Sequence, residues 1–351
     1  MKKITLLSLS IFALTFNTKA QNGLENILFA DISDANKLTT AYSKPVAEGF
    51  IYGMSNGWYH TAKVHKPFGF DISIGGNFSF SGDDKKVFDV NSLNLSSNIT
   101  QNPTTSPTAL GSDNAAINGF EVTIPANSEP NINGGVHPEL TRNFTMPDGF
   151  RSDLPLNGVP TPVIQVSLGL PKKFEATLRL VPKAGSDEIK AQLFGLGVKK
   201  EITDWFGPIG KTPLHISLMG AFTNMTVTNI IEDPNGSEID ISNGVAELKL
   251  NSYTVQALAS LNFPFINVYG GFGYVSGSSS LTVAGNYAFE YSGGGQTFTK
   301  ELVDPLNLDF DASGITTTIG ARISLGFFKL YGSYSLQEYN TANLGIAFSF
   351  R

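Results

Sequence analysis

The chain has 351 residues, with 24 Lys and Arg against 30 Asp and Glu, a formal net charge of −6, and no Cys. The acidic balance argues against a nucleic-acid partner, which needs a basic face. The lack of Cys excludes a small disulfide-stapled domain. Charged residues make up only 15% of the chain, below the roughly 25% of soluble proteins, as is typical of a membrane β-barrel whose strands each have one apolar face.

The first 20 residues have the features of a secretory signal peptide. Lys2 and Lys3 precede an apolar stretch over residues 4–16, and a cleavage position follows near Ala20. The apolar stretch is too short to span a membrane as a helix. Removing this segment takes three Lys with it and changes the formal net charge from −6 to −9. We expect export and exclude residues 1–20 from the fold.

Residues 21–67 have helical periodicity. A first short helix is expected from Ser33 to Tyr42, and a second helix, with Pro45 in its first turn, is expected to end at Met54. In a barrel protein such a segment lies in the lumen as a plug, or beneath the barrel as a periplasmic leader. The candidate plug residues are Tyr42, Phe50, Met54 and Trp58.

Ten later segments alternate apolar and polar residues with the period of two that is typical of strands. The last is the clearest, because Leu344, Ile346, Phe348 and Phe350 share one face. These segments predict an all-β fold, a transmembrane antiparallel up-and-down β-barrel of 10–14 strands with a short N-terminal helical segment. The ten segments are 68–80, 164–170, 174–180, 188–201, 214–222, 253–263, 266–274, 315–325, 328–336 and 344–350.

The connections between these strands differ in length. An even strand count places both chain ends in the periplasm. The short turns near 171–173, 204–208, 262–265 and 326–328 then fall on the periplasmic side, and the long insertions 81–161, 183–187, 231–243 and 275–314 fall outside. Further hairpins within 84–92 and 281–303 would extend above the membrane or raise the strand count. The apolar phase changes near Asn251, which indicates a β-bulge or the membrane rim.

The insertion 81–161 is rich in Asn, Ser, Thr, Pro and Gly. This composition predicts too little apolar area for a core of its own. A loop this long is expected to constrict a pore, to cover the top of the barrel, or to be a solvated surface loop.

Charged residues occur at lumen-facing positions of several strands. Their mixed signs predict no strong ion preference, and Glu175 and Arg179 could instead pair with neighbours across the sheet to fill a narrow barrel. The candidate lumen-lining residues are Asp71, Glu175, Arg179, Lys199, Arg322 and Lys329.

Motifs for metal binding and catalysis are weak. Asp309, Asp311 and Ser313 resemble the first half of a calcium loop, but Gly320 replaces the Glu expected at its twelfth position. His60 and His65 are five residues apart, which does not suit one helical face. We expect no enzyme and no cofactor, because no phosphate-binding loop or local Ser–His–acid motif is present in the sequence.

The chain resembles outer-membrane β-barrels of Bacteroidota. Residues 195–202, followed by Asp204 and Trp205, are similar to a motif of an uncharacterised family of such proteins. The N-terminal segment is similar in layout to that of FadL-type transporters of hydrophobic compounds. Ser43, Lys44 and Pro45 stand where that family has Asn-Pro-Ala, so the resemblance implies no particular binding residues here.

We therefore expect an outer-membrane channel or transporter for small solutes, hydrophobic compounds included. The alternatives are a non-transporting barrel that acts as a surface anchor or adhesion platform through 81–161, and an outer-membrane enzyme. The expected partners are outer-membrane lipid, the barrel-assembly machinery and a small-molecule solute, with no nucleic acid.

Overall fold

The computed structural model describes residues 27–101, 104–112, 119–127, 136–186, 188–231, 239–293 and 295–350. The predicted export signal, residues 1–20, lies outside these residues. Among the described residues, no helix combines the length and the apolar character that crossing a membrane requires.

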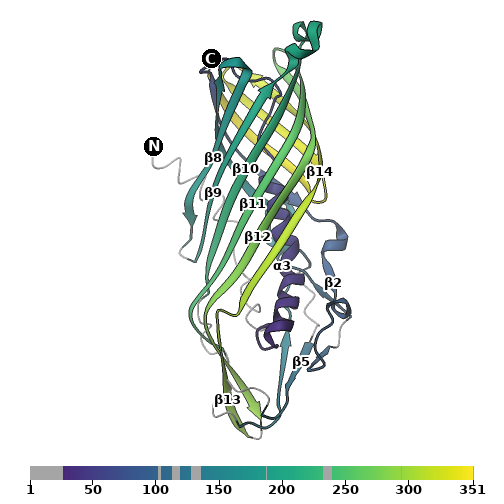
Figure 1. Ribbon diagram of the computed structural model, residues 1–351, viewed down its shortest axis with the longest axis vertical. Coiled ribbons are helices and arrows are strands. Elements are labelled where there is room, and N and C mark those ends of the chain that lie inside the picture. The colour runs from purple at the N-terminus through teal and green to yellow at the C-terminus, as the bar shows by residue number, and fades with distance from the viewer. Residues whose placement is uncertain are drawn as a thin grey trace.

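Ten strands close into an antiparallel ring within the described part of the chain (Figure 1). Neighbours in sequence pair with one another, and the first strand pairs with the last from Phe70 opposite Phe350 to Phe80 opposite Asn340. The predicted all-β barrel is confirmed. The ring strands are β1 (Phe70–Phe80), β7 (Val159–Leu170), β8 (Phe174–Gly185), β9 (Ile189–Glu201), β10 (Leu214–Ile231), β11 (Ile239–Asn262), β12 (Ile266–Gly293), β14 (Leu306–Leu325), β15 (Phe328–Leu336) and β16 (Asn340–Phe350).

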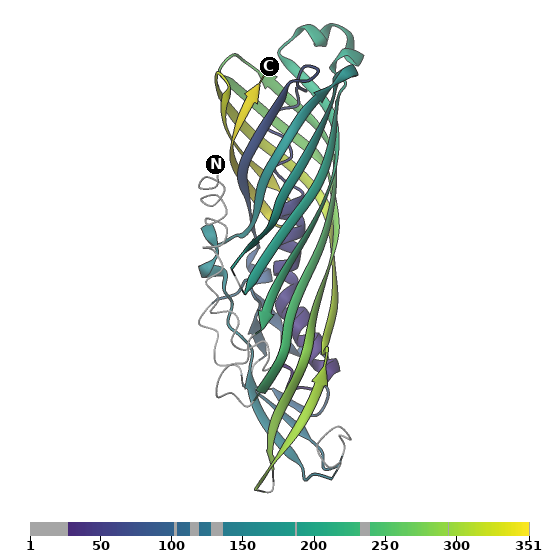
Figure 2. The ribbon, with the colours of Figure 1, turned by 90° about the vertical axis from the view of Figure 1, so that its left-hand side faces the viewer.

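The ring is much taller on one side than on the other. Strands β1 and β16 have 11 residues each, whereas β11 has 24 and β12 has 28. Short turns join the strands at one end, here called the short-turn end, and the tall side projects at the other, the extended end (Figures 1 and 2). Strand β13 (Gln296–Val303) pairs with β12 in this projection, so the region predicted as the insertion 275–314 lengthens the wall.

The apolar residues of β14 change from the inner to the outer face partway along the strand. Leu306, Leu308 and Phe310 are buried inside, whereas Ile315 and Ile319 are exposed outside. The pairing with β12 is continuous across this point. The backbone register therefore stays the same, and what changes is the environment of the outer face of the strand. The outer apolar face, here called the belt, is the surface that a spanning barrel presents to lipid.

The phase change near Asn251 has the same origin. Leu250 is buried inside the barrel, and Tyr253 and Val255 are exposed outside. Asn251 pairs in register with Asn224 and with Ser278, and the register shift between β11 and β12 lies farther out, between Ser242 and Val245. Of the two predicted causes, the edge of the belt is therefore supported, and a bulge at this position is not.

The calcium candidate is wrong. Asp309, Asp311 and Ser313 lie on the outer, exposed face of the regular strand β14. A calcium loop has to turn sharply so that its oxygens converge, and an extended strand spreads them along its length. Within the described ranges, no group of three or more His, Cys, Asp or Glu residues is arranged to hold a metal ion.

One continuous helix replaces the two that were predicted in the N-terminal segment. Helix α3 spans Ile32–Met54 and contains Pro45 in its interior, where proline usually breaks a helix. Most of the helix is buried, and the enclosure of this length of helix outweighs the hydrogen bond that Pro45 cannot donate. Gly57 has φ +73° and comes after the end of the helix.

The described part of the insertion 81–161 forms short strands, and its buried apolar residues share a core with other elements, which agrees with the prediction that it has no core of its own. It contains β2 (Val87–Asp89) paired with β4 (Thr105–Pro107), and a sheet of β3 (Ile99–Gln101), β5 (Gly119–Ile124) and β6 (Leu140–Thr145). Phe120, Leu140 and Phe144 are buried together with Leu38 of α3 and Phe289 of β12. The insertion buries apolar area by sharing a core with the helix and the tall wall. We call this part of the molecule the outer chamber.

Candidate functional site

The N-terminal segment runs through the ring from the extended end to the short-turn end. Phe29 packs against Phe289 of the projecting wall, with ring centroids 5.1 Å apart. At the other end, the Phe68 amide donates to the Gly169 carbonyl beside the β7–β8 turn, at 2.8 Å. The first part of α3 lies in the outer chamber, its last turns lie inside the ring, and residues 55–66 continue past the belt. Residues 32–66 are called the plug below.

Two glycines bring α3 close to the barrel wall. A Cβ on Gly53 would lie 2.5 Å from Thr161 Oγ1, and a Cβ on Gly49 would lie 2.8 Å from a methyl carbon of Val159. Only glycine permits these approaches, since real Cβ atoms do not come within 3.0 Å of a neighbour. The helix therefore touches β7 with its backbone.

Side chains of the barrel satisfy the carbonyls at the end of α3. The Arg179 guanidinium donates to Met54 O at 3.0 Å and Asn56 O at 2.9 Å, and the Asn77 amide donates to Gly53 O at 2.8 Å. These carbonyls have no partners within the helix, and a cation near a helix C-terminus also opposes its dipole. The wall thus caps the helix.

Trp58 lies in a slot on the inner face of β9. Its ring faces Gly195 and Gly197, where a Cβ would lie 2.9 and 3.0 Å from the indole, and the Arg179 guanidinium lies 3.9 Å from the ring centroid. Farther along β9, Lys199 donates to the Thr61 carbonyl at 3.2 Å. The inner face of the motif at 195–202 is therefore a cradle for the plug.

A cluster of ionisable side chains joins the plug to four strands near the short-turn end. His60 Nε2 lies 3.0 Å from an Asp71 oxygen, and Arg322 donates to His60 Nδ1 at 2.9 Å. Because a guanidinium can only donate, Nδ1 accepts and Nε2 carries the proton shared with Asp71. His60 is therefore held as the neutral Nε2–H tautomer.

The same cluster continues through His65. Its Nδ1 lies 2.8 Å from Glu175, and its backbone N–H donates to the same carboxylate at 3.0 Å. Glu175 also pairs with Lys199 of the neighbouring strand at 2.7 Å. Asp71, Glu175 and Lys199 are all buried, and charges in such a place persist only where they are paired and hydrogen-bonded.

The predicted site residues fall into three groups. Asp71, Glu175, Arg179, Lys199 and Arg322 meet the plug or its neighbours, whereas Lys329 donates to the Gly326 carbonyl in the β14–β15 turn. Glu175 pairs across the sheet as the alternative prediction supposed, and Arg179 binds the plug and Gln165. Of the candidate plug residues, Phe50, Met54 and Trp58 are buried in the barrel and Tyr42 is buried in the outer chamber.

The barrel wall contains an unpaired seam between β7 and β8. These strands pair only from Gln165 opposite Arg179 to Leu170 opposite Phe174. Within the described residues, no ladder pair joins 159–164 to 180–185, although β7 pairs with β1 and β8 with β9 along these lengths. This part of the wall faces the viewer in Figure 2.

Prolines lie on both edges of the seam. Pro160 and Pro162 are on β7, and Pro182 lies at a register shift in β8. Proline has no N–H to donate and is normally confined to edge strands and bulges. The seam begins at the outer edge of the belt. Its first residue on β8 is Leu180, which pairs with Phe194 of β9, and both are exposed apolar residues.

The interior behind the seam is apolar. Val159 and Val181 on its two edges belong to one buried cluster with Phe50 and Met54 of the plug and Leu193 of β9. Nearer the short-turn end, the lumen is filled by the polar contacts of Arg179 and the ionic cluster. An apolar molecule therefore meets a compatible surface at the seam and an incompatible one along the axis.

Sequence reasoning missed the two histidines, the seam and the helix packing. The spacing of the histidines does not suit one face of a helix, but the chain there is irregular and not helical. The seam has a signal in the sequence, because Pro160, Pro162 and Pro182 flank the predicted strands 164–170 and 174–180. Gly49, Gly53 and Gly57 recur every four residues, a spacing that indicates one small-residue face of a helix.

The closed antiparallel ring, its even number of described strands and its outer apolar belt define a β-barrel of the outer-membrane type. The chain belongs to the family of unknown function DUF6588, whose family model matches residues 1–350. No functionally curated protein matches its sequence.

Solved barrels are similar to this chain only in outline. Ail, the attachment invasion locus protein of Yersinia pestis, is 11% identical, with 81% of this chain and 100% of that chain covered and a TM-score of 0.25. The translocator domain of the autotransporter NalP from Neisseria meningitidis is 11% identical, with 82% and 90% covered and a TM-score of 0.27. The CymD monoaromatic hydrocarbon channel is 10% identical, with 82% and 90% covered and a TM-score of 0.17. Function has to be argued from the geometry of this chain.

Proposed function

We propose that the protein is an outer-membrane transporter for small hydrophobic molecules, with a route that leaves the barrel sideways through the seam. The extended end faces outward, as the short turns at the other end favour. A molecule enters through the outer chamber, passes along α3, and reaches the membrane between β7 and β8. Outer-membrane lipid and the barrel-assembly machinery are its expected partners, and its role is transport without catalysis.

The single observation that carries this proposal is the seam lined by apolar side chains. The seam starts at the outer edge of the belt. An open strand edge that meets lipid there leaves polar backbone groups without partners, which costs several kcal/mol for each group. Proline lowers that cost because it has no N–H group to leave unpaired. Three prolines at one break indicate that the wall is built to open there.

The plug supports a lateral route over an axial one. Arg179 and the ionic cluster hold the plug by hydrogen bonds to charged groups, each worth about 1.5–3 kcal/mol. Asn77 adds a neutral hydrogen bond to Gly53 O. By contrast, the contact of α3 with β7 at Gly49 and Gly53 involves Val159 and Thr161, next to the seam. A small shift of α3 there opens the route while the axis stays closed.

The test restores pairing across the seam. A triple variant, Pro160→Val, Pro162→Val and Pro182→Val, supplies three backbone donors and β-branched side chains. Uptake of the hydrophobic dye N-phenyl-1-naphthylamine into intact Gram-negative cells is measured for cells that express wild type, the variant or no barrel. We expect wild type to accelerate uptake and the variant to return it to the empty-cell rate. Pro305→Val, between β13 and β14, is the matched control.

Two outcomes would contradict the proposal. If uptake is the same with and without the wild-type barrel, the protein does not transport hydrophobic molecules. If uptake in the triple variant stays at the wild-type rate, the seam is not the route. Heat-modifiable migration on a gel confirms that each variant is a folded barrel.

A surface platform is the second candidate function, favoured by one observation. The sheet of β3, β5 and β6 in the outer chamber bears an open pocket of about 450 Å³. Binding of cells to surfaces coated with host or environmental polymers, with and without the barrel, tests this function. The pocket is lined by Thr100, Gly119, Phe120, Glu121, Arg142, Asn143, Phe144 and Thr145.

A further inference from the structure

Exposed lysines gather at the short-turn end of an otherwise acidic chain. Lys172 and Lys173 form the turn between β7 and β8, and Lys200 lies near the end of the neighbouring strand β9. Lys63 and Lys66, where the plug leaves the barrel, are also exposed. Asp204 is the exposed acidic residue beside them, at 2.7 Å from Lys173.

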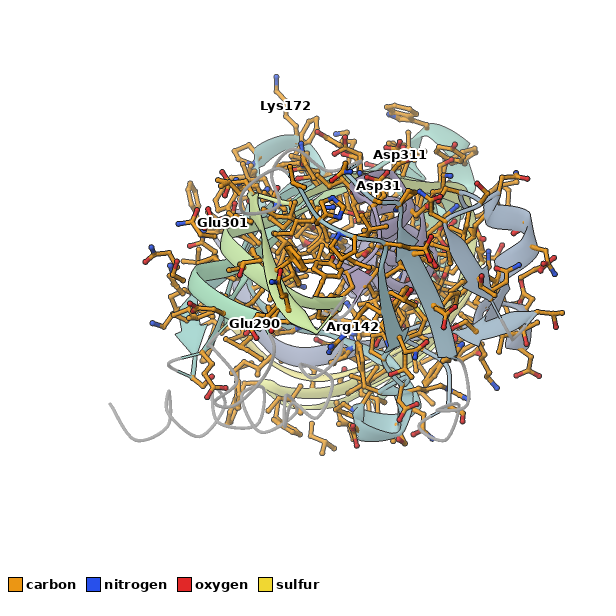
Figure 3. The ribbon with its side chains drawn as sticks, turned by 90° about the horizontal axis from the view of Figure 1, so that it is seen from below. Asp31, Arg142, Lys172, Glu290, Glu301 and Asp311 are labelled. Atoms are coloured by element: carbon orange, nitrogen blue, oxygen red, sulfur yellow. The ribbon has the colours of Figure 1, made fainter. Side chains whose placement is uncertain are left out.

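Three of these lysines lie at the edge of the belt. Lys200 Nζ lies 4.4 Å from the centroid of the Phe174 ring and donates to the Lys172 carbonyl. Phe174 itself faces outward and is 37% exposed. Lys172 has φ +59° and projects away from the ring (Figure 3). The Lys200 ammonium group therefore lies at the edge of a lipid-facing aromatic ring, which is the level of phospholipid headgroups, and Lys172 and Lys173 lie in the adjoining turn.

The opposite end of the molecule has the opposite charge. Asp31, Glu290, Glu301 and Asp311 are exposed near the extended end, which faces the viewer in Figure 3. Each lysine near an anionic leaflet is worth about fivefold in binding, and the exposed lysines at the short-turn end lie at the rim of the barrel.

We propose that Lys172, Lys173 and Lys200 form a binding site for the phosphate headgroup of an anionic phospholipid, with its acyl chains against Phe174. The occupant is lipid because the site borders the belt and because Lys200 is held over a lipid-facing ring. The site adds a lipid preference to the barrel and does not depend on the transport route.

The test uses a tryptophan reporter at the site. The variant Phe174→Trp with Trp205→Phe places one lipid-facing indole beside Lys200, and the remaining Trp58 is buried and serves as a constant background. The protein is refolded into phosphatidylcholine vesicles with 20 mol% of either dibrominated phosphatidylglycerol or dibrominated phosphatidylcholine. Bromine quenches only indoles that it contacts, so the difference in quenching reports local enrichment.

We expect brominated phosphatidylglycerol to quench several-fold more than brominated phosphatidylcholine at low salt. Lys172→Gln, Lys173→Gln and Lys200→Gln together should make the two lipids equal, while Lys183→Gln, Lys190→Gln and Lys249→Gln, the same charge change toward the extended end, should preserve the difference. Equal quenching in the parent, or a difference that survives the first triple variant, would overturn the proposal. Loss of the difference on adding millimolar inorganic phosphate would show a general phosphate site instead and overturn the lipid assignment.

Discussion

Arg179 connects the barrel wall to the chain inside it at a single residue. It is fully buried, donates to Met54 O and Asn56 O, and stacks on Trp58. A guanidinium suits this position because its planar fork serves two carbonyls at once and its face packs on an aromatic ring. The bonds made by Arg179 therefore determine how firmly the plug is held.

Arg179→Met should loosen the plug while the ring persists. The variant removes the charged donor from both carbonyls. Each carbonyl keeps a neutral donor, Thr223 for Met54 O at 3.3 Å and Asn77 for Asn56 O at 3.1 Å, so the expected cost is about 1.5–3 kcal/mol. We expect transient openings in planar-bilayer recordings where wild type is quiet. Lys329→Met removes another inward cation, one that donates to the β14–β15 turn, and should record like wild type. An Arg179→Met trace that cannot be told from wild type would mean that this side chain does not hold the plug.

Glu338 gives the outer chamber a dependence on pH. Lys85, in the 3₁₀ turn Asp83–Lys85, donates to Glu338 at 2.9 Å, and Tyr52 of α3 donates to the other oxygen at 3.2 Å. The hydrogen bond from Lys85 is the main cause that lowers the pKa of Glu338. A lowered carboxyl pKa stabilises the folded state fully above the ordinary Glu value of about 4.3. That stabilisation is lost as the pH falls through the folded-state pKa.

Acid should therefore release the start of the insertion from the β15–β16 turn. Hydrogen exchange of residues 83–90, corrected for its intrinsic pH dependence, should rise as the pH falls below about 4. Glu338→Gln should show the faster exchange already at pH 7 and little further change in acid. Exchange in wild type that is flat over this range would contradict a role for the pair.

At the scale of elements, the contact between α3 and β7 depends on Gly53, because atoms of β7 lie too close to it to leave room for a side chain. Thr161 Oγ1, which would lie 2.5 Å from a Cβ on Gly53, has no hydrogen-bond partner among the described atoms. At Thr161 the helix therefore meets β7 by close packing and without a hydrogen bond. A larger residue on the helix at this contact should therefore be compensated by a smaller residue on the strand.

Gly53→Ala should destabilise the protein by about 1–3 kcal/mol through overpacking, and Thr161→Ala should restore most of that loss. The double variant removes Oγ1 and leaves the Thr161 Cβ at 3.4 Å, with the Ser79 hydroxyl at 3.0 Å as the remaining close contact, one that a rotation of that side chain relieves. Urea unfolding in lipid vesicles measures both variants. If Gly53→Ala is neutral, or if the double variant is no better than the single one, the helix is not seated as described.

Deletion of residues 27–66 tests the plug as an element. The ring is paired from β1 to β16 without this segment, so the barrel should still form and migrate as a heat-modifiable band. Single-channel conductance in planar bilayers should increase severalfold, because a barrel of this size is otherwise filled. Unchanged conductance would mean that residues 27–66 do not block the lumen.

The strands of the ring could be predicted from sequence because a period of two is local and survives without knowledge of neighbours. The change in the phase of the apolar residues at Asn251 indicated the position of the belt edge in the same way, because it is also a local pattern. The core that the insertion shares could not be predicted, because Phe120 and Phe144 bury their area against α3 and β12, which are distant in the chain. The partners of Arg179 were equally hidden, since the carbonyls of Met54 and Asn56 have no signature in the sequence.

At the scale of the whole molecule, the belt predicts how charge is tolerated at different heights. Ile319 faces outward in the belt and is 66% exposed, and Ser313 faces outward on the same strand beyond the edge of the belt. Ile319→Arg should cost about 2–4 kcal/mol in a bilayer, and Ser313→Arg should cost less than 1 kcal/mol. Urea unfolding from vesicles compares them. Equal effects would mean that no membrane surrounds the ring.

The direction of α3 has a consequence for biogenesis. Ile27 to Ala30 are buried at the extended end, and Gly69 is hydrogen-bonded to Gly169 at the short-turn end. The polypeptide therefore crosses the ring once before its first ring strand begins. The ring closes where β16 pairs with β1, and we expect this pairing to form around the N-terminal segment, so that one step of insertion both closes the wall and encloses the plug.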